Sequence, residues 1–309
     1  MRTAKPVQTA PSTQSEKHQE TSRPSPPAYP PFQPIPGLSN FRDVGGWPIT
    51  PSRTSPSPQH VRRNLIFRGG DTTRITPEGE AKLRQLGVKK DYDLRSKQQI
   101  EKTGGVKEME GIERVWTPVF GEEEYTEEKA RERYELYAGE GTDGIVRAFI
   151  EILYAGAPML RRVLGDLLDA SSTSTSSAIF LHCTTGNNRT GVFVALLLLL
   201  LRVPHAHIVR EYVLSEAGLA PSRHVNVERL LKKGAFAEYG LEEARRKCER
   251  MVGARSESME ALLKEAVSRW GEDGIGYFQG VVGLTEEEIE RLRGLMTVEG
   301  AGLGDIVGG

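Results

Sequence analysis

The sequence predicts an α/β protein with a central, mostly parallel, twisted sheet flanked by helices. Three short apolar segments are typical of strands: NLIFRGG (64–70), VKKDYDLRS (88–96) and IERVWTPVF (112–120). A helical pattern separates the first two, as expected for parallel strands, which need a long crossover connection. A fourth segment, AIFLHC (178–183), is an almost continuous apolar run, which is typical of a strand buried on both faces of a parallel sheet.

The amino-terminal segment, residues 1–34, is rich in Pro, Ser, Thr and Gln. It has too few large apolar side chains to offset the entropy lost on ordering, so we expect a disordered leader. Its block SPPAYPPFQP (25–34) is suited to binding a proline-recognising partner as a polyproline helix. We expect one folded domain over residues 35–298 and a flexible tail over 299–309.

Helices are predicted from caps and from apolar periodicity. In TPEGEAKLRQLG (76–87), Thr76 caps the helix, Pro77 suits its first position and Gly87 ends it. Thr285 and Glu288 have the spacing of a capping box for a helix that ends near Met296. Further helical patterns cover residues 122–170, 206–217, 226–250 and 258–270.

The composition excludes several functions. A formal net charge of −1 argues against binding to nucleic acid or to a membrane surface through bulk charge. The apolar run 192–201 is about half the length that a bilayer requires, so we expect a buried helix and no stable membrane insertion. Cys183 and Cys248 cannot form a disulfide framework, which favours the cytoplasm. His205 and His207 diverge on a helix, so we expect no metal and no cofactor.

The segment HCTTGNNRTG (182–191) carries the chemistry. If the buried strand ends at Cys183 and a helix begins near Arg189, the backbone between them must curl tightly, which Gly186 permits. The curl points successive N–H groups inward at the amino end of a helix, where they favour an anion. The same field lowers the pKa of a thiol at its base. We therefore expect Cys183 to be a thiolate nucleophile below a phosphate-binding cup.

Other residues of this loop have separate expected roles. Arg189 would grip two phosphate oxygens with its planar fork. The hydroxyl of Thr190 would donate to the sulfur as it leaves, and His182 would hold the shape of the loop through hydrogen bonds. Attack by the thiolate would give a phosphocysteine that water then hydrolyses. The phosphate-binding residues would be Thr184, Thr185, Gly186, Asn187, Asn188 and Arg189.

The loop resembles the Cys-x5-Arg loop of cysteine-dependent protein tyrosine phosphatases, and is most similar to a fungal and microbial tyrosine/serine-type branch. That branch is related to secreted mycobacterial enzymes that also act on phosphoinositides. Four other stretches carry the resemblance: NFRDVGG (40–46), IFRGGD (66–71), DLRS (93–96) and residues 254–293. The resemblance implies a protein tyrosine phosphatase-like fold, a metal-free hydrolase, Cys183 as nucleophile, Arg189 as phosphate clamp and the amides of 184–189 as the cradle.

The chain departs from this family at Asn187 and Asn188, where many relatives have Lys-Asp. Neither asparagine can supply a positive charge or a carboxyl proton. A general acid is needed chiefly for a poor leaving group such as an alkoxide. Asp43 and the run Glu122–Glu124 are candidates for this role. The alternatives are that Asp43 only fixes a turn and that the glutamates form a solvated surface.

The candidate functions all use the anion-binding loop at Cys183. The first is hydrolysis of phosphotyrosine or a related phosphoester, with a phosphorylated protein or phosphoester as the substrate. A phosphoinositide phosphatase is a variant of the same chemistry. The second is a phosphate-binding pseudophosphatase that recognises a phosphorylated partner. Sulfur transfer also uses a cysteine in an anion-binding loop, but the pattern around Arg189 favours phosphate.

Overall fold

The structure is a computed structural model that describes residues 30–51, 57–124, 126–171 and 177–300. The predicted leader and tail therefore lie mainly outside the described residues, as does most of the proline block. Glu299 and Gly300, which the sequence assigns to the tail, are described: Glu299 ends a strand and Gly300 N–H donates to the Pro58 carbonyl, 2.9 Å away.

The central sheet has the strand order β1-β4-β7-β5-β6. Its strands are β1 (Arg42–Asp43), β4 (Ile66–Gly69), β5 (Val88–Asp93), β6 (Glu113–Trp116) and β7 (Ala178–His182). The pairs β4–β7, β7–β5 and β5–β6 are parallel, and only β1 runs antiparallel to its neighbour β4. The predicted α/β class with a mostly parallel sheet is confirmed.

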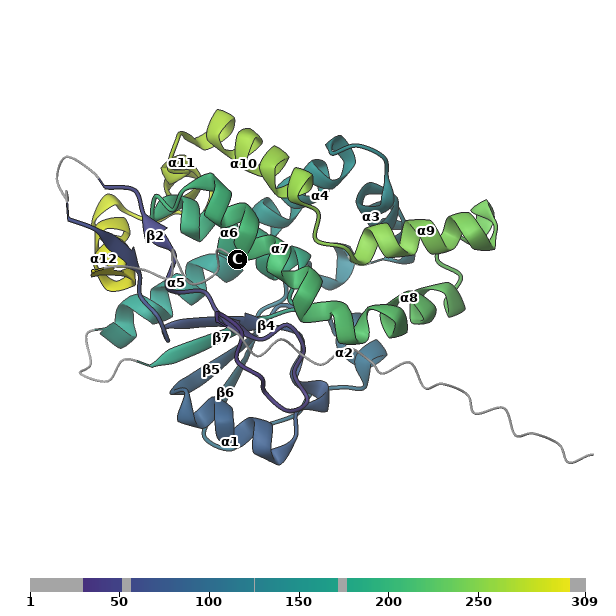
Figure 1. Ribbon diagram of the computed structural model, residues 1–309, viewed down its shortest axis with the longest axis horizontal. Coiled ribbons are helices and arrows are strands. Elements are labelled where there is room, and N and C mark those ends of the chain that lie inside the picture. Colours follow the sequence, from purple (N-terminus) through teal and green to yellow (C-terminus); the bar gives the residue numbers. More distant parts are fainter. Residues whose placement is uncertain (1–29, 52–56, 125, 172–176, 301–309) are drawn as a thin grey trace, which may run out of the picture.

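Helices cover both faces of this sheet (Figure 1). The amino-terminal half of the chain contributes α1 (Pro77–Gln85), α2 (Lys97–Thr103), α3 (Glu127–Ala138), α4 (Asp143–Ala155) and α5 (Ala157–Ser171). The second half contributes α6 (Asn188–Leu200), α7 (His205–Leu219), α8 (Arg223–Lys232), α9 (Leu241–Val252), α10 (Ser256–Trp270), α11 (Ile275–Gly280) and α12 (Glu286–Met296). The predicted caps of α1 and α12 are present, with Thr76 accepting from Gly79 and Thr285 from Glu288.

Strand β7 lies in the middle of the sheet, and its alternating side chains enter two separate cores. Ile179 and Leu181 pack in the large core below α4–α7, whereas Phe180 packs in the smaller core with Leu83 of α1. This explains why the strand is apolar throughout, since both of its faces are buried.

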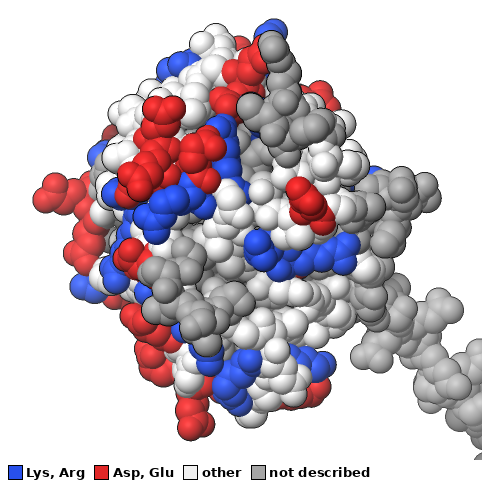
Figure 2. Space-filling view, turned by 90° about the vertical axis from the view of Figure 1, so that its left-hand side faces the viewer, with Lys and Arg blue, Asp and Glu red and all other residues white. Residues whose placement is uncertain are grey.

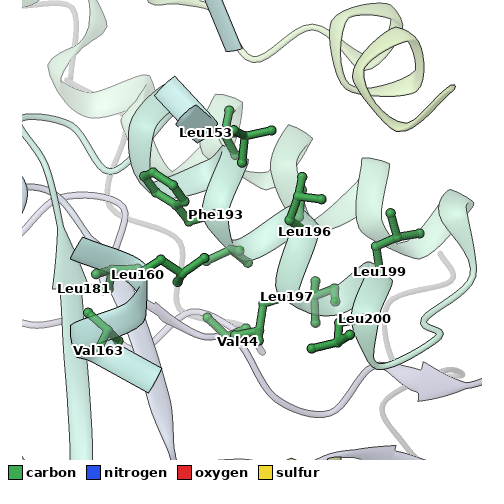
Figure 3. Packing of buried hydrophobic residues seen from close by; sticks show 14 of the residues in the cluster. Val44, Leu153, Leu160, Val163, Leu181, Phe193, Leu196, Leu197, Leu199 and Leu200 are labelled. Carbon is green, nitrogen blue, oxygen red and sulfur yellow. The ribbon is translucent and has the colours of Figure 1, made fainter. Parts of the chain in front are cut away.

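Helix α6 is the centre of the large core (Figure 3), and every residue from Thr190 to Leu200 is buried. Phe193, Leu196 and Leu197 pack among leucines of α4 and α5. Burial on all sides positions the amino terminus of α6, where the Cys183 loop lies. Within the described ranges, no helix is long and apolar enough to cross a membrane.

Two features differ from the sequence prediction. A second sheet, with the order β2-β3-β8, joins β2 (Pro48–Ile49), β3 (Gln59–Val61) and β8 (Thr297–Glu299). These strands are too short to give a periodic pattern. The predicted helix over 226–250 is interrupted between α8 and α9, because Gly234 and Gly240 adopt positive φ values of 72° and 79°.

Candidate active site

The segment 182–191 forms the predicted strand–loop–helix unit. Cys183 follows β7 and is 2% exposed, and α6 begins at Asn188. Gly186 has φ +66°, and a Cβ at this position would lie 2.1 Å from the Gly69 carbonyl oxygen. Only glycine fits this turn, because both its dihedral angle and the space around it exclude a side chain.

The backbone carbonyls of the loop are held on its outer side. Arg68 donates to the carbonyls of Gly186 and Asn187, and Asn40 Nδ2 donates to the Thr185 carbonyl, 3.1 Å away. In a trans peptide unit the C=O and the following N–H point in opposite directions. The N–H groups that follow these carbonyls, those of residues 186–188, are therefore directed away from Arg68 and Asn40, toward the inside of the loop.

A buried ionic network supports these donors. Both Arg42 and Arg68 are 0% exposed and share the Glu211 carboxylate of α7, with N–O distances of 2.8 and 2.5 Å. Arg42 also donates to Ser215 Oγ (3.1 Å) and to the Asn40 side chain (2.5 Å). Burial favours the neutral acid, but the two guanidinium groups lower the pKa of Glu211 below its ordinary value. Glu211 is thus a buried carboxylate that orients both arginines behind the loop.

The thiol of Cys183 lies in a field that favours the thiolate. Burial raises its pKa, but the Arg189 guanidinium, the Thr190 hydroxyl and the backbone N–H groups of Thr190 and Thr185 together lower the pKa of Cys183 to about 7. Thr190 Oγ1 is buried and has no partner besides this thiol among the described residues. The lowered pKa favours the thiolate form of Cys183 near neutral pH.

Arg189 is held over the loop by α2 and its own loop. Its guanidinium donates to Gln99 Oε1, to the Leu94 carbonyl (3.4 Å) and to Thr184 Oγ1 (3.3 Å). Gln99 also accepts from the N–H of Ser96, 3.2 Å away, in the capping box of α2. The contact between Gln99 and Arg189 was not predicted from the sequence. The Ser-x-x-Gln spacing of Ser96 and Gln99, which is typical of a capping box at the start of a helix, could have indicated Gln99.

His182 is buried between two carboxylates. Its Nε2 lies 3.0 Å from Asp91 Oδ1, and its Nδ1 lies 4.0 Å from Asp93 Oδ1 and 3.1 Å from the Cys183 carbonyl oxygen. Burial favours the neutral ring, but the two carboxylates raise the pKa of His182 to about 9. Asp93 also forms a buried ion pair with Arg95, at 2.8 Å.

The two asparagines of the loop have different partners. Asn187 is 2% exposed, and its Nδ2 donates to the carbonyls of Val252 (3.4 Å) and Gly253 (3.1 Å) after α9. Its side chain therefore fixes the loop to α9, while its backbone N–H remains on the inner side. Asn188 Oδ1 accepts a hydrogen bond of 2.9 Å from the buried Tyr212 hydroxyl.

Of the candidate acids, Asp43, Glu122 and Glu123 do not line the pocket above Cys183. The Asp43 carboxylate accepts from the N–H groups of Gly45 (2.8 Å) and Asn64 (2.9 Å), which is the geometry of a turn, and burial raises its pKa. Glu122 is exposed and lies 3.5 Å from Lys97. The Glu124 side chain is outside the described part of the chain.

A pocket opens above Cys183 between the loop and α3, α8 and α9, which lie together on one side of the molecule (Figure 1). Its walls carry the aromatic rings of Phe120, Tyr134 and Tyr137, and the Arg133 guanidinium lies 3.7 Å from the centre of the Phe120 ring. The described lining residues carry no carboxylate. This aromatic pocket is lined by Gln99, Phe120, Ala130, Arg133, Tyr134, Tyr137, Cys183, Thr184, Thr185, Asn187, Asn188, Arg189, Asn226, Arg229, Leu230, Met251 and Val252.

Comparisons with known proteins agree on the class of this site. A model of a tyrosine phosphatase family matches residues 33–298. A triple specificity protein phosphatase, PtpB, from Mycobacterium tuberculosis is 23% identical over 286 residues, which cover 85% of this chain and 98% of that protein. A tyrosine-protein phosphatase from Nostoc commune is 26% identical over 238 residues, which cover 75% of this chain and 74% of that protein.

Proposed function

The chain belongs to the tyrosine phosphatase family and is a phosphatase, and from this premise we propose that it hydrolyses phosphotyrosine, or a related aryl phosphoester, through a phosphocysteine on Cys183. The observation that carries the proposal is the position of Cys183, at the base of the aromatic pocket and below Arg189, with its thiol pKa lowered to about 7. Cys183 is the nucleophile, Arg189 the phosphate clamp and the inner N–H groups of the loop the cradle.

In the first step the thiolate attacks phosphorus as the bond to the phenolic oxygen breaks. Negative charge on the phosphoryl oxygens is met by the inner N–H groups and by Arg189, so positioning and charge provide most of the catalysis. Arg189 can turn from Gln99 to the phosphate, since both contacts use the same guanidinium. In the second step water attacks phosphorus, inorganic phosphate leaves and the thiolate is restored, with Thr190 donating to the sulfur.

The side chain of Asn188 determines which leaving groups this site can serve. Since Tyr212 occupies Oδ1, the amide NH₂ group is available toward the pocket and can donate a hydrogen bond, but it carries no transferable proton. A phenolate needs little protonation as it departs, whereas an alkoxide needs a general acid. The aromatic walls fit a phenyl ring, so both features favour aryl phosphates. In the proposal Asp43 serves as a structural residue that fixes the turn to Asn64.

The test is hydrolysis of an aryl phosphate by the full chain, with Cys183→Ser as the control. We expect kcat/KM to fall by at least about 10³-fold in the variant, because serine is not ionised at neutral pH. Rapid mixing should also give a burst of phenol equal to the enzyme concentration if hydrolysis of the phosphocysteine is the slower step.

The alternative of a phosphate-binding pseudophosphatase was suggested by Asn187, Asn188 and the lack of an obvious general acid, and the similarity to phosphatases does not favour it. The same assay separates the two candidates. Absence of turnover that depends on Cys183, together with retained binding of phosphotyrosine, would establish a binding protein. Turnover of thiosulfate but not of aryl phosphate would instead indicate sulfur transfer.

The cytoplasm is the location that suits this mechanism. Cys183 and Cys248 are both free, and a catalytic thiolate must stay reduced. Fractionation of cells that express the full chain would test this assignment, with recovery in an oxidising compartment as the contrary result.

A further inference from the structure

A second pocket adjoins the aromatic pocket. The two pockets share Thr184, Thr185, Asn226 and Arg229 in their walls. Instead of aromatic rings, the second pocket presents hydroxyl groups, which belong to Ser39, Thr73, Thr103 and Ser222 in addition to those of the loop. A molecule bound at the Cys183 cup can therefore contact two chemically different surfaces at once.

The second pocket carries positive charge without carboxylate partners. Arg74 and Arg229 line it, and Lys102 directly precedes the lining residue Thr103. None of these three, nor the nearby Lys233, makes an ion pair with any residue that the structure describes. Desolvation and the positive charges of Arg229 and Lys102 lower the pKa of Lys233, as expected when cations gather without compensation.

The acidic group in this pocket is already committed elsewhere. Asp71 lies 3.5 Å from the Arg95 guanidinium and accepts from the N–H of Thr73, and it forms no ion pair with Arg74 or Arg229. On the face in Figure 2, by comparison, acidic and basic side chains lie largely beside one another. Elsewhere arginines such as Arg246 and Arg293 each contact two carboxylates.

We propose that this pocket, lined by Arg74 and Arg229 beside Lys102, is a subsite for a second anionic side chain on the same peptide as the phosphotyrosine. The inference rests on the proposed function: the aromatic pocket takes the phenyl ring, the cup takes its phosphate, and the peptide continues past Thr184 and Thr185. The anionic group is a carboxylate or a second phosphate, both of which an arginine fork binds. A peptide is favoured over a polyol phosphate because the aromatic walls can stack with the phenyl ring of a phosphotyrosine.

The test uses the Cys183→Ser chain as a binding probe, so that it does not depend on turnover. Three phosphotyrosine peptides are compared, with neutral flanking residues, with flanking Asp and Glu, and with a flanking phosphoserine. We expect the acidic peptides to bind at least about fivefold more tightly at low ionic strength, and the gain to shrink as salt is added. Equal affinity for the neutral and acidic peptides would overturn the subsite.

Charge-reversal variants then locate the effect. Arg74→Glu and Lys102→Glu, each in the Cys183→Ser chain, should remove most of the preference for acidic peptides. The matched control is Arg147→Glu, an exposed arginine of α4 that lines neither pocket, and it should leave the preference unchanged. Equal loss of preference in the control would mean that net charge, not this pocket, attracts the peptide.

With the active chain, the preference should appear in KM more than in kcat, since the second anion is bound equally before and during the reaction. If the chain hydrolyses all the peptides with equal KM, the subsite is contradicted but the proposed function is not. If the acidic peptides bind more tightly but no turnover depends on Cys183, the proposed function is contradicted but the subsite is not. A soluble inositol bisphosphate is the competing ligand. If it binds more tightly than every acidic peptide, and if Arg74→Glu removes this tighter binding, the pocket is a site for polyol phosphates and the peptide proposal is overturned.

Discussion

The two sides of the Cys183 loop are built in opposite ways. On the outer side, the carbonyls of residues 185–187 are bound by Asn40 and Arg68, and Arg68 is paired with the buried Glu211 carboxylate. On the inner side, the N–H groups and the thiol face the aromatic pocket. The contrast shows how a loop can keep its inner N–H groups available for phosphate. The hydrogen bonds to its outer carbonyls fix the loop conformation, so the inner N–H groups do not have to stabilise it.

Removing Glu211 should break the outer side and give the largest effect. In Glu211→Ala two buried guanidinium groups lose their shared carboxylate, which we expect to lower the free energy of unfolding by about 3–5 kcal/mol. The measurement is urea denaturation. The matched control is Glu242→Ala on the exposed start of α9, which should change stability by less than about 0.5 kcal/mol. Similar values for the two variants would show that the network does not support the loop.

The sequence predicts the inner side of the loop well and the outer side poorly. Cys183, Gly186 and Arg189 lie within one short segment, so their spacing alone indicates a phosphate cup. The outer contacts join residues far apart in the chain, since Asn40 meets the loop across 145 positions and Arg42 meets Glu211 across 169. Within the predicted helix 206–217, nothing distinguishes Glu211 from an exposed charge. Burial of a charged residue depends on tertiary packing, which one sequence does not reveal.

The same reasoning explains which parts of the fold were predicted. Strand β7 gives a strong signal because every residue in it is buried, and α1 and α12 are marked by caps. Strands β1 and β2 are two residues long, and pairing with distant partners defines them more than their own composition does. Asn187 was expected only at the phosphate, and its side-chain contact with Gly253 depends on how α9 packs.

Changing Arg189 to lysine tests the inner side and should have the next largest effect. Lysine keeps the positive charge near Cys183 but loses the planar fork, so kcat/KM for an aryl phosphate should fall by roughly 10²–10³-fold. The pKa of the thiol, followed by its rate of alkylation against pH, should stay near its lowered value in Arg189→Lys. It should rise in Arg189→Ala, which loses the charge as well. A normal kcat/KM in Arg189→Lys would contradict the role of the fork.

Adding a carboxyl group to the inner side should have a smaller, selective effect. In Asn188→Asp we expect kcat/KM to rise about tenfold for an alkyl phosphate and to stay unchanged for an aryl phosphate, because only the alkoxide needs a proton. Since Tyr212 donates to this position, Asn188→Asp combined with Tyr212→Phe should hold its proton at higher pH. The optimum pH for the alkyl substrate should shift upward in the double variant. No gain on the alkyl substrate would show that a proton donor already exists elsewhere.

The last effect that we predict is a dependence of stability on pH, caused by His182, which lies next to Cys183 at the base of the loop. Its pKa of about 9 in the folded protein exceeds the ordinary 6.5, so the folded state holds this proton more tightly than the unfolded chain does. The resulting stabilisation is complete below about pH 6.5 and is lost as the pH rises to about 9. The Cys183 thiol acts in the opposite sense, because its pKa is lowered to about 7 and its stabilisation grows above that pH.

The two contributions can be separated in the Cys183→Ser variant. This variant lacks the thiol, so of the two groups only the His182 imidazole still titrates. There the free energy of unfolding, measured in urea between pH 6.5 and 9, should decrease steadily. The decrease should disappear when His182→Gln is added, because glutamine keeps a hydrogen-bonding side chain but has no titrating group. A flat profile with His182 present would mean that the buried ring is neutral. In that case His182 would act on the loop through the contact between its Nδ1 and the Cys183 carbonyl oxygen, and not through charge.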